Sequence, residues 1–174
     1  NTTDPIIRYS YDAINWFNTT LSEQNGKDIV WSSPNVGKMN IQQPTIVGGS
    51  GIQSTMAFSI DGIQYRNLGN GIFTSSCNAI CWNGLIWLAG GAGDNHTLAY
   101  SYYGLQWNGL GKTIFNQSCY SISWNGSVWL AGGEGANTIA TSTDGIQWTG
   151  QGNTIFDNKT ISSDWNGYVW LISG

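Results

Sequence analysis

The hydrophobic positions of the chain occur in short runs separated by turns rich in glycine and asparagine. One unit contains the run Ser76–Trp82, the dipeptide Asn83-Gly84 and a returning run, Leu85–Ala89. Asn-Gly between two apolar runs is typical of a β-hairpin, because both residues tolerate a positive φ. Two further runs follow, at Thr97–Ser101 and Leu105–Trp107. The pattern therefore predicts four short antiparallel strands in each unit.

This pattern recurs along the chain with a nearly constant period. Trp82-Asn83-Gly84 returns 42 residues later as Trp124-Asn125-Gly126, and after another 41 residues as Trp165-Asn166-Gly167. A repeat of this length with four strands is typical of a propeller blade. We therefore expect an all-β fold, a β-propeller of about four four-stranded antiparallel blades forming a single domain. The expected units span approximately 17–65, 66–107 and 108–148, and the fourth combines 149–174 with 1–16.

The fourth unit has only two strands after Lys159, and runs of the third- and fourth-strand type stand at the start of the chain. These runs are Ile6–Ser10 and Ile14–Trp16, so that Asn1 follows Gly174 almost in register. A last blade closed by N- and C-terminal strands would remove the open sheet edges of an incomplete ring. Two alternatives stay open: two chains sharing an eight-bladed ring, which would be a homo-oligomer, and a piece of a longer propeller.

The ten tryptophans all fall at three repeat positions, which favours packing in the core over stacking on sugars. They stand before the first hairpin turn, after it, and at the end of the fourth run: Trp31, Trp82, Trp124, Trp165; Trp87, Trp129, Trp170; Trp16, Trp107, Trp148.

Composition narrows the range of partners. Only 9% of residues are charged, the formal net charge is −4, and the six basic residues are scattered, so we expect no nucleic-acid partner. No apolar run approaches the roughly 18 residues that a membrane span needs, and we expect none. Of the three cysteines, Cys77 and Cys119 share a repeat position. We expect free, buried thiols, with a bridge between Cys77 and Cys119 as the alternative.

Three turns share the motif Ser-x-Asp-x-x-x-aromatic, with Gly after Asp in two of them. They are Ser10–Trp16, with Ala13 in the glycine position, Ser59–Tyr65 and Ser142–Trp148. The aspartate can accept hydrogen bonds from the amides of its own turn. The motif resembles the Asp box of sialidase-type propellers, shortened by one residue. In that family the box is a structural turn away from the active site, so the resemblance implies a scaffold role. Tyr103 replaces the aspartate in the remaining unit.

A closer resemblance covers nearly the whole chain. Ile114-Phe115, Cys119, Trp124–Gly126, Trp129–Gly133 and Ala140–Trp148, with their copies, resemble the tandem repeats of uncharacterised propeller-like proteins of giant DNA viruses of protists. The resemblance implies a propeller-like repeat protein, and it does not fix an activity.

An enzyme is not expected from these residues. Sialidases hold a carboxylate with three arginines, and this chain has only Arg8 and Arg66. Its single histidine, His96, has no second His or Cys spaced to join it. We therefore assign no catalytic, cofactor-binding or metal-binding residues.

Candidate contact residues are those at which the copies disagree. The loops that follow the second run and the insertion between Ser32 and Pro44 provide most of them. The candidates are Asp94, Asn95, His96, Glu134, Asn137, Lys38, Met39 and Tyr103. We expect the loop face to make polar contacts with a protein or a glycan partner.

Six Asn-x-Ser/Thr sequons indicate an exposed, extracellular or virion-surface glycoprotein. They are at Asn1, Asn18, Asn95, Asn116, Asn125 and Asn158. We therefore expect a non-catalytic structural or recognition propeller. The alternatives are a carbohydrate-binding lectin with one site per blade and a fragment of an Asp-box glycoside hydrolase.

Overall fold

The computed structural model of the chain describes residues 7–21, 25–31 and 44–174. The elements of this part are all β-strands, which form three four-stranded antiparallel sheets and two separate two-stranded hairpins. The prediction of an all-β chain with repeated four-stranded antiparallel sheets is therefore confirmed. Asn1, Lys38 and Met39 lie outside the described residues.

The strands of each four-stranded sheet follow one another in chain order. Sheet 1 consists of β3 (Asn25–Trp31), β4 (Thr45–Ser50), β5 (Met56–Ser59) and β6 (Arg66–Gly69). Sheet 2 consists of β7 (Ser76–Trp82), β8 (Trp87–Ala92), β9 (Leu98–Ser101) and β10 (Asn108–Gly109). Sheet 3 consists of β11 (Ser118–Trp124), β12 (Trp129–Glu134), β13 (Ile139–Ser142) and β14 (Thr149–Gly150). The terminal hairpins are β1 (Arg8–Tyr9) with β2 (Phe17–Asn18), and β15 (Ser162–Trp165) with β16 (Trp170–Ser173).

The fourth strand of each unit begins later than the sequence indicates. Leu105–Trp107 was expected as a strand, whereas these residues belong to the turn and pairing starts at Asn108. The indole N–H of Trp107 donates to the carbonyl of Gly104 at 3.0 Å, and Trp148 makes the same bond to Gly145. The aromatic residue thus closes the turn, and the strand can form only after it.

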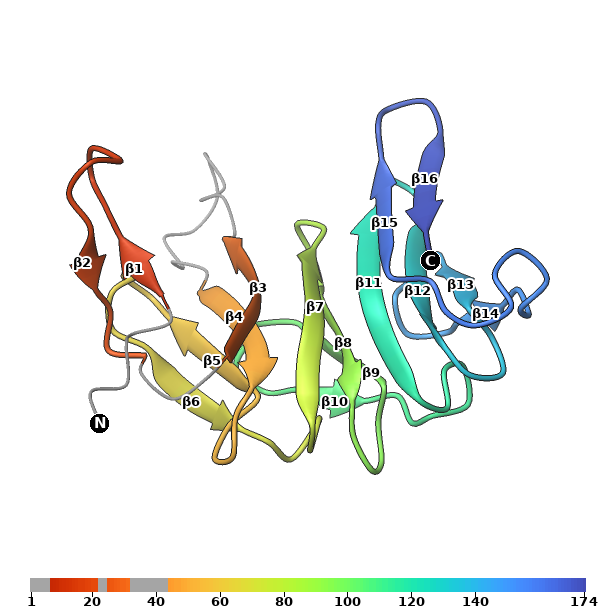
Figure 1. Cartoon of the computed structure of the whole chain (residues 1–174), viewed down its shortest axis with the longest axis horizontal. Helices are drawn as coiled ribbons and strands as arrows, with labels where there is room; N and C mark the ends of the chain where they lie inside the picture. The colour runs from red at the N-terminus through yellow and green to blue at the C-terminus, as the bar shows by residue number, and fades with distance from the viewer. Residues whose placement is uncertain (1–6, 22–24, 32–43) are drawn as a thin grey trace.

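The sheets stand side by side in a curved row, with their first strands in contact (Figure 1). β7 contacts both β3 and β11, and β11 contacts β15. Because each sheet is apolar on the faces turned to its neighbours, the core lies between the sheets. Ile46 of sheet 1 packs with Phe73, Cys77 and Trp87 of the sheet 2 unit in one such cluster. Leu88 of sheet 2 packs with Cys119 and Trp129 of sheet 3 in the next.

A glycine on the second strand allows each sheet to approach the next one closely. A Cβ atom on Gly48 would lie 2.8 Å from Cys77 Sγ, and one on Gly90 would lie 2.5 Å from Cys119 Sγ. A Cβ atom on Gly132 would meet Thr160 in the same way, at 2.6 Å. The first glycine of each Ala-Gly-Gly copy, or Val-Gly-Gly in sheet 1, is therefore required because the following unit places a side chain there.

A second repeated contact is a hydrogen bond from a buried threonine to the segment that connects one sheet to the next. The hydroxyl groups of Thr55, Thr97 and Thr138 donate to the carbonyls of Phe73, Phe115 and Phe156, at 2.7, 2.7 and 3.0 Å. Each threonine lies in the loop after the second strand, and each phenylalanine precedes the first strand of the next unit. The bond thus holds each connecting segment against the sheet that it leaves.

The tryptophans pack as predicted in the middle of the row and are only partly covered at its ends. Trp87 and Trp129 are fully buried, and Trp82 and Trp124 pack on them with ring centroids 5.0 and 4.7 Å apart. By contrast, Trp16 on the N-terminal hairpin is 57% exposed. Core packing therefore accounts for the middle tryptophans, whereas Trp16 has no neighbouring sheet to cover it fully.

The blade expected from both chain ends is not formed within the chain. β1 pairs with β2 and β15 pairs with β16, and these hairpins lie at opposite ends of the row (Figure 1). The N-terminal hairpin rests on sheet 1, where Ile7 contacts the Val47 cluster, the C-terminal hairpin rests on sheet 3, and the open row of sheets between them keeps the two hairpins apart. The expectation that the termini close one sheet is corrected accordingly.

Candidate functional site

The aspartates of the Asp-box-like turns are occupied by their own backbone. Asp61 Oδ1 accepts from the amides of Ile63 and Gln64 at 2.9 and 2.8 Å, and Asp144 makes the equivalent bonds. These amide donors hold the pKa of both carboxyls below the ordinary range. Asp12 is bonded in the same manner, and its pKa is lowered as well. These carboxylates are structural acceptors that stay ionised.

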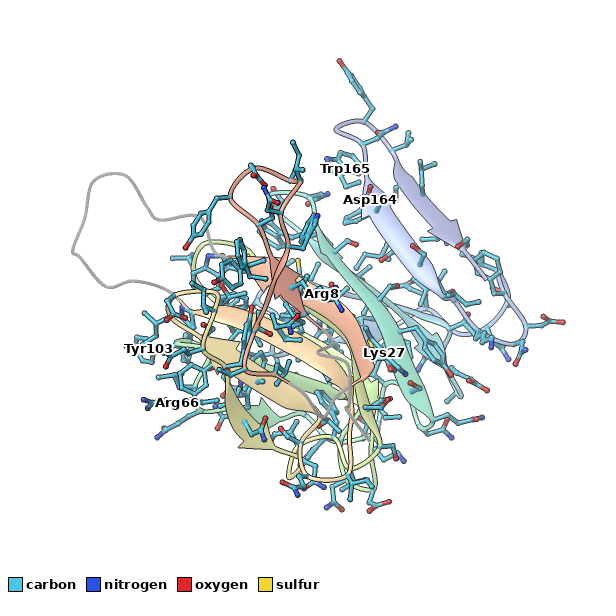
Figure 2. All side chains as sticks on the ribbon, turned by 60° about the vertical axis from the view of Figure 1, so that its left-hand side comes forward. Arg8, Lys27, Arg66, Tyr103, Asp164 and Trp165 are labelled. Atoms are coloured by element: carbon cyan, nitrogen blue, oxygen red, sulfur yellow. The ribbon has the colours of Figure 1, made fainter. Side chains whose placement is uncertain are left out.

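Tyr103 stands where the other turns have aspartate, and Ser101 supplies the side-chain acceptor for the amides of its turn. Ser101 Oγ accepts from the amides of Tyr103 and Gly104 at 3.3 and 2.8 Å. The Tyr103 side chain is 69% exposed. Figure 2 shows it with Arg66 at one edge of the molecule, away from Lys27 and from Asp164. Tyr103 follows the C-terminal end of β9, whereas Asp94, Asn95 and His96 precede its N-terminal end, so the structure does not bring Tyr103 together with these candidates.

The loop between β8 and β9 carries Asp94, Asn95 and His96. Asp94 and Asn95 are exposed, and the amide of Asp94 donates to Thr74 Oγ1 at 3.0 Å. His96 is half-buried, and its Nδ1 accepts from the amide of Gly111 at 2.9 Å. The imidazole thus holds the following loop in place, while Asp94 and Asn95 are presented to solvent.

The equivalent loop of sheet 3 repeats this arrangement with Asn137. Its Oδ1 accepts from the amide of Gly152 at 2.9 Å, as His96 does from Gly111. Glu134, at the end of β12, accepts from the hydroxyl of Tyr120 at 2.7 Å. Two of the candidates, His96 and Asn137, are therefore loop supports, and Glu134 belongs to a second group of residues.

That second group is a row of side chains from β-bulges in the first strands. β3, β7 and β11 each contain a register shift at the same repeat position, and the extra residues are Lys27, Asn78 and Tyr120. We call these three residues the bulge row. Bulges re-aim the side chain of the inserted residue. Each of the three neighbouring sheets thus has one side chain that projects away from the regular strand pattern.

The bulge row links the sheets through consecutive contacts. Lys27 Nζ donates to Asn78 Oδ1 at 2.9 Å, and Asn78 Nδ2 donates to Ser118 Oγ at 3.0 Å. Next to them, Lys159 Nζ lies 5.7 Å from the centroid of the Tyr120 ring. The row and its neighbours Glu134 and Lys159 thus bring two cationic groups and one anionic group to the first strands.

Asp28, next to Lys27, ties sheet 1 to sheet 2. Its Oδ2 accepts from the amide of Ile80 at 2.7 Å. Partial burial raises the pKa of Asp28 above its ordinary value, against the effect of that bond. The carboxylate is thus committed to the contact between the sheets.

Sequence reasoning missed the bulge row and identified only its neighbour Glu134. Lys27, Asn78 and Tyr120 have nothing in common as residue types, and a bulge built without glycine has no composition signal. The one available signal is an interruption of the alternation in Ser76–Trp82, where Ala79 and Ile80 are consecutive buried residues.

The three cysteines are free, and burial suppresses their chemistry. Burial raises the pKa of Cys77 and Cys119 far above the ordinary range, and it raises that of Cys81 to about 11. Cys77 and Cys119 lie in different contacts, against Gly48 and Gly90, and they do not form the alternative bridge. The thiols are packing groups in this fold.

The described sequons differ in what their side chains do. Asn18, Asn95 and Asn158 are exposed. Asn116 Oδ1 accepts from the amide of Ala136 at 3.1 Å, and Asn125 Oδ1 accepts from two amides of its hairpin turn.

Within residues 7–21, 25–31 and 44–174, no group of three or more His, Cys, Asp or Glu side chains is placed to hold a metal ion. The same part of the chain contains no helix with the length and apolar character that a bilayer crossing requires. No model of a known protein family and no curated protein matches the chain.

Proposed function

We propose that the chain is a non-catalytic, propeller-type repeat module that recognises a polar partner, a protein or a glycan, through one composite surface. This surface combines the bulge row, with Glu134 and Lys159, and the neighbouring β8–β9 and β12–β13 loops. The observation that carries the proposal is the bulge itself, which turns one residue of each first strand out of the repeated core.

The asymmetry of this surface supports one binding area across several sheets. The three bulge positions hold a lysine, an asparagine and a tyrosine, while the packing positions around them repeat. A lectin with one equivalent site per unit would place the same groups in each unit. The bulge row therefore favours a single composite surface over the lectin alternative, and a glycan stays within the proposal as one polar partner.

The propeller itself is part of the proposal. Radially repeated four-stranded sheets with their first strands adjacent are the arrangement of propeller blades. The resemblance to the giant-virus repeats and the exposed sequons at Asn18, Asn95 and Asn158 support a virion-surface or extracellular setting. A fragment of an Asp-box hydrolase receives no such support, because the box aspartates are bound to their own turns.

The test compares binding by the wild-type chain, by Lys27→Ala with Glu134→Gln, and by Arg66→Ala. Arg66 lies apart from Lys27 in Figure 2, so Arg66→Ala removes a positive charge outside the proposed surface. Binding is measured on a printed glycan array and by capture of proteins from host-cell surfaces. The proposal is supported if the double variant loses a binding signal that the wild-type chain and Arg66→Ala both keep. Equal binding by all three chains, or no binding by the wild-type chain in either assay, contradicts it.

A further inference from the structure

We propose that the two terminal hairpins are complementary halves of one four-stranded sheet, and that the halves join between copies of this chain. β15–β16 of one copy would supply the first two strands, and β1–β2 of the next copy would supply the last two. This junction is separate from the recognition surface and does not depend on its ligand.

The C-terminal hairpin has the pairing of the first two strands of a sheet. Ser162 pairs with Ser173 and Trp165 pairs with Trp170. In sheet 3 the equivalent pairs are Ser121 with Gly132 and Trp124 with Trp129. The residue spacing is identical, so β16 corresponds to β12, and its free edge corresponds to the edge on which β12 binds β13.

The N-terminal hairpin has the pairing of the last two strands. Arg8 pairs with Asn18 and Tyr9 pairs with Phe17. The equivalent pairs in sheet 3 are Ala140 with Gly150 and Thr141 with Thr149. The hairpin turn carries the Asp12 box, as the β13–β14 turn carries the Asp144 box. β1 therefore corresponds to β13, the strand that β16 lacks.

This correspondence fixes the register of the junction. Trp129 pairs with Ser142 and Leu130 pairs with Thr141 in sheet 3. The same register places Trp170 of one copy opposite Ser10 of the next, and Leu171 opposite Tyr9. Arg8 and Ile172 would face each other where sheet 3 has the paired alanines Ala140 and Ala131. The side chains at this pair are therefore larger at the junction than inside the row.

Residues that are buried inside the row are exposed at its ends. Leu171 is 58% exposed, whereas its counterparts Leu88 and Leu130 are 1% and 7% exposed. On sheet 1, Ile29 is 52% exposed, whereas its counterpart Ile80 is 4% exposed. Addition of the missing half-sheet would cover these side chains at both ends, and burial of apolar side chains favours association.

The sizes of the facing residues are also complementary. Inside the row, a glycine of the second strand faces Cys77, Cys119 or Thr160 of the next unit. At the junction Ser173 takes the glycine position and Gly26 takes the cysteine position, because the pairings of Gly26 and Cys77 are equivalent. At the junction the side chain is therefore on the second strand and the glycine is on the first strand, the reverse of the arrangement inside the row. Beside Gly26 a cavity of about 290 Å³, lined also by Ile7 and Val47, lies where the second copy's strands would enter.

The positions of the hairpins in the row favour a second copy over closure within one chain. Thr20 Oγ1 accepts from the amide of Tyr65 at 2.8 Å and holds the N-terminal segment on sheet 1. Ser123 Oγ donates to the carbonyl of Ser163 at 2.6 Å and holds β15 on sheet 3. The hairpins thus lie at opposite ends of the row (Figure 1), and closure within one chain would require the whole row to bend until they meet. Two copies can join with both sets of contacts intact.

A disulfide between copies tests the register directly. In a Cys81→Ser background, Leu171→Cys chains are mixed with Tyr9→Cys chains and oxidised. Opposite residues in an antiparallel pair lie about 4.5 to 5.5 Å apart at Cα, within the range of a disulfide. The matched control mixes Leu171→Cys with Phe17→Cys, whose position is one strand further away, at about 10 Å. We expect a covalent dimer in the first mixture, well above the amounts formed in the control mixture and by each variant alone.

A double variant, Leu171→Cys with Tyr9→Cys in one chain, separates the two forms of closure. The proposal predicts covalent oligomers, and an internally bridged monomer overturns it. Sedimentation of the wild-type chain gives a readout without cysteine: a mass above 18.9 kDa is expected, which Leu171→Lys lowers to one chain and Tyr168→Lys does not. A wild-type monomer at all concentrations also overturns the junction. Loss of partner binding with Lys27→Ala would not change either readout, so the two proposals fail separately.

Discussion

The thiol of Cys119 occupies the space beside Gly90 that a side chain on residue 90 would need. A Cβ atom there would lie 2.5 Å from Sγ and 3.2 Å from the Cδ1 atom of Ile122. Both partners are core residues, and neither can move away without disturbing the contact between sheets 2 and 3. The Gly90–Cys119 pair therefore sets how closely the two sheets approach.

Gly90→Ala is expected to lower the free energy of unfolding by about 1 to 3 kcal/mol, the usual cost of overpacking a core. Urea denaturation measures the change. Gly71→Ala is the matched control, because Gly71 is exposed and nothing lies within 4 Å of its added Cβ. A loss for Gly71→Ala as large as that for Gly90→Ala would contradict the packing argument.

The contact between the two residues can also be tested with a compensating double variant. Cys119→Gly combined with Gly90→Ala should cost less than the sum of the single variants, with a coupling of about 0.5 to 3 kcal/mol for residues in contact. Additive losses in a double-mutant cycle would mean that the two residues do not share this space.

Thr97→Val should lower the free energy of unfolding by about 1 to 3 kcal/mol, because the carbonyl of Phe115 would stay buried without its 2.7 Å bond. Valine keeps the shape of the side chain, so the loss reports on the hydroxyl. Thr113→Val at an exposed position is the control. Equal stability of wild type and Thr97→Val would show that the bond does not hold the connecting segment.

Tyr103→Asp should complete the incomplete turn and stabilise the protein at neutral pH. The new carboxylate would accept from the amides of Leu105 and Gln106, as Asp61 does from its own turn. Its pKa in the folded state should be lowered, like those of Asp61 and Asp144. The gain should therefore be complete above the unfolded pKa of about 3.9 and should disappear as the pH falls through the folded pKa.

Thermal unfolding between acidic and neutral pH measures this gain against Tyr103→Asn, which presents an uncharged acceptor. The stability difference between the aspartate and asparagine variants should vanish at low pH. A difference that stays constant with pH would exclude the carboxylate as its cause.

The native protein should react slowly with thiol reagents near neutral pH. Burial raises the pKa of Cys81 to about 11 and those of Cys77 and Cys119 further, so the thiolate is scarce at all three. Titration with a chromogenic disulfide should label the folded chain slowly and should find three thiols in denaturant. Rapid labelling of the folded chain, or fewer than three thiols after unfolding without reductant, would contradict this account.

Local pattern was sufficient for much of the fold. The Asn83-Gly84 turn and the apolar run before it predict β7 with its observed bounds, because hairpin chemistry is encoded in adjacent residues. The fourth strand was misplaced, since nothing local shows that the Trp107 indole bonds back to Gly104 and extends the turn. The contact of Cys119 with Gly90 was also out of reach, because it depends on how two sheets approach each other in space.

The candidate site was less accessible to sequence reasoning than the fold. Disagreement between copies pointed to His96 and Asn137, yet both side chains support a following loop in the same way. Glu134 was identified, whereas its partner Tyr120 was not, because a bulge shows only in the pairing of two strands. A repeat reveals which positions are architectural more readily than which are functional.

The central claim is that the repeated glycines and threonines build the close contacts between sheets, whereas Lys27 and the exposed loop residues contribute little to stability. A scan of single substitutions at every position, read out as resistance of the folded chain to protease, tests it most directly. We predict that sensitivity peaks at Gly48, Gly90 and Gly132 and at Thr55, Thr97 and Thr138, and that Lys27, Asp94 and Asn95 tolerate substitution. Sensitivity without this repeat, or concentrated in the bulge row and loops, would contradict the account.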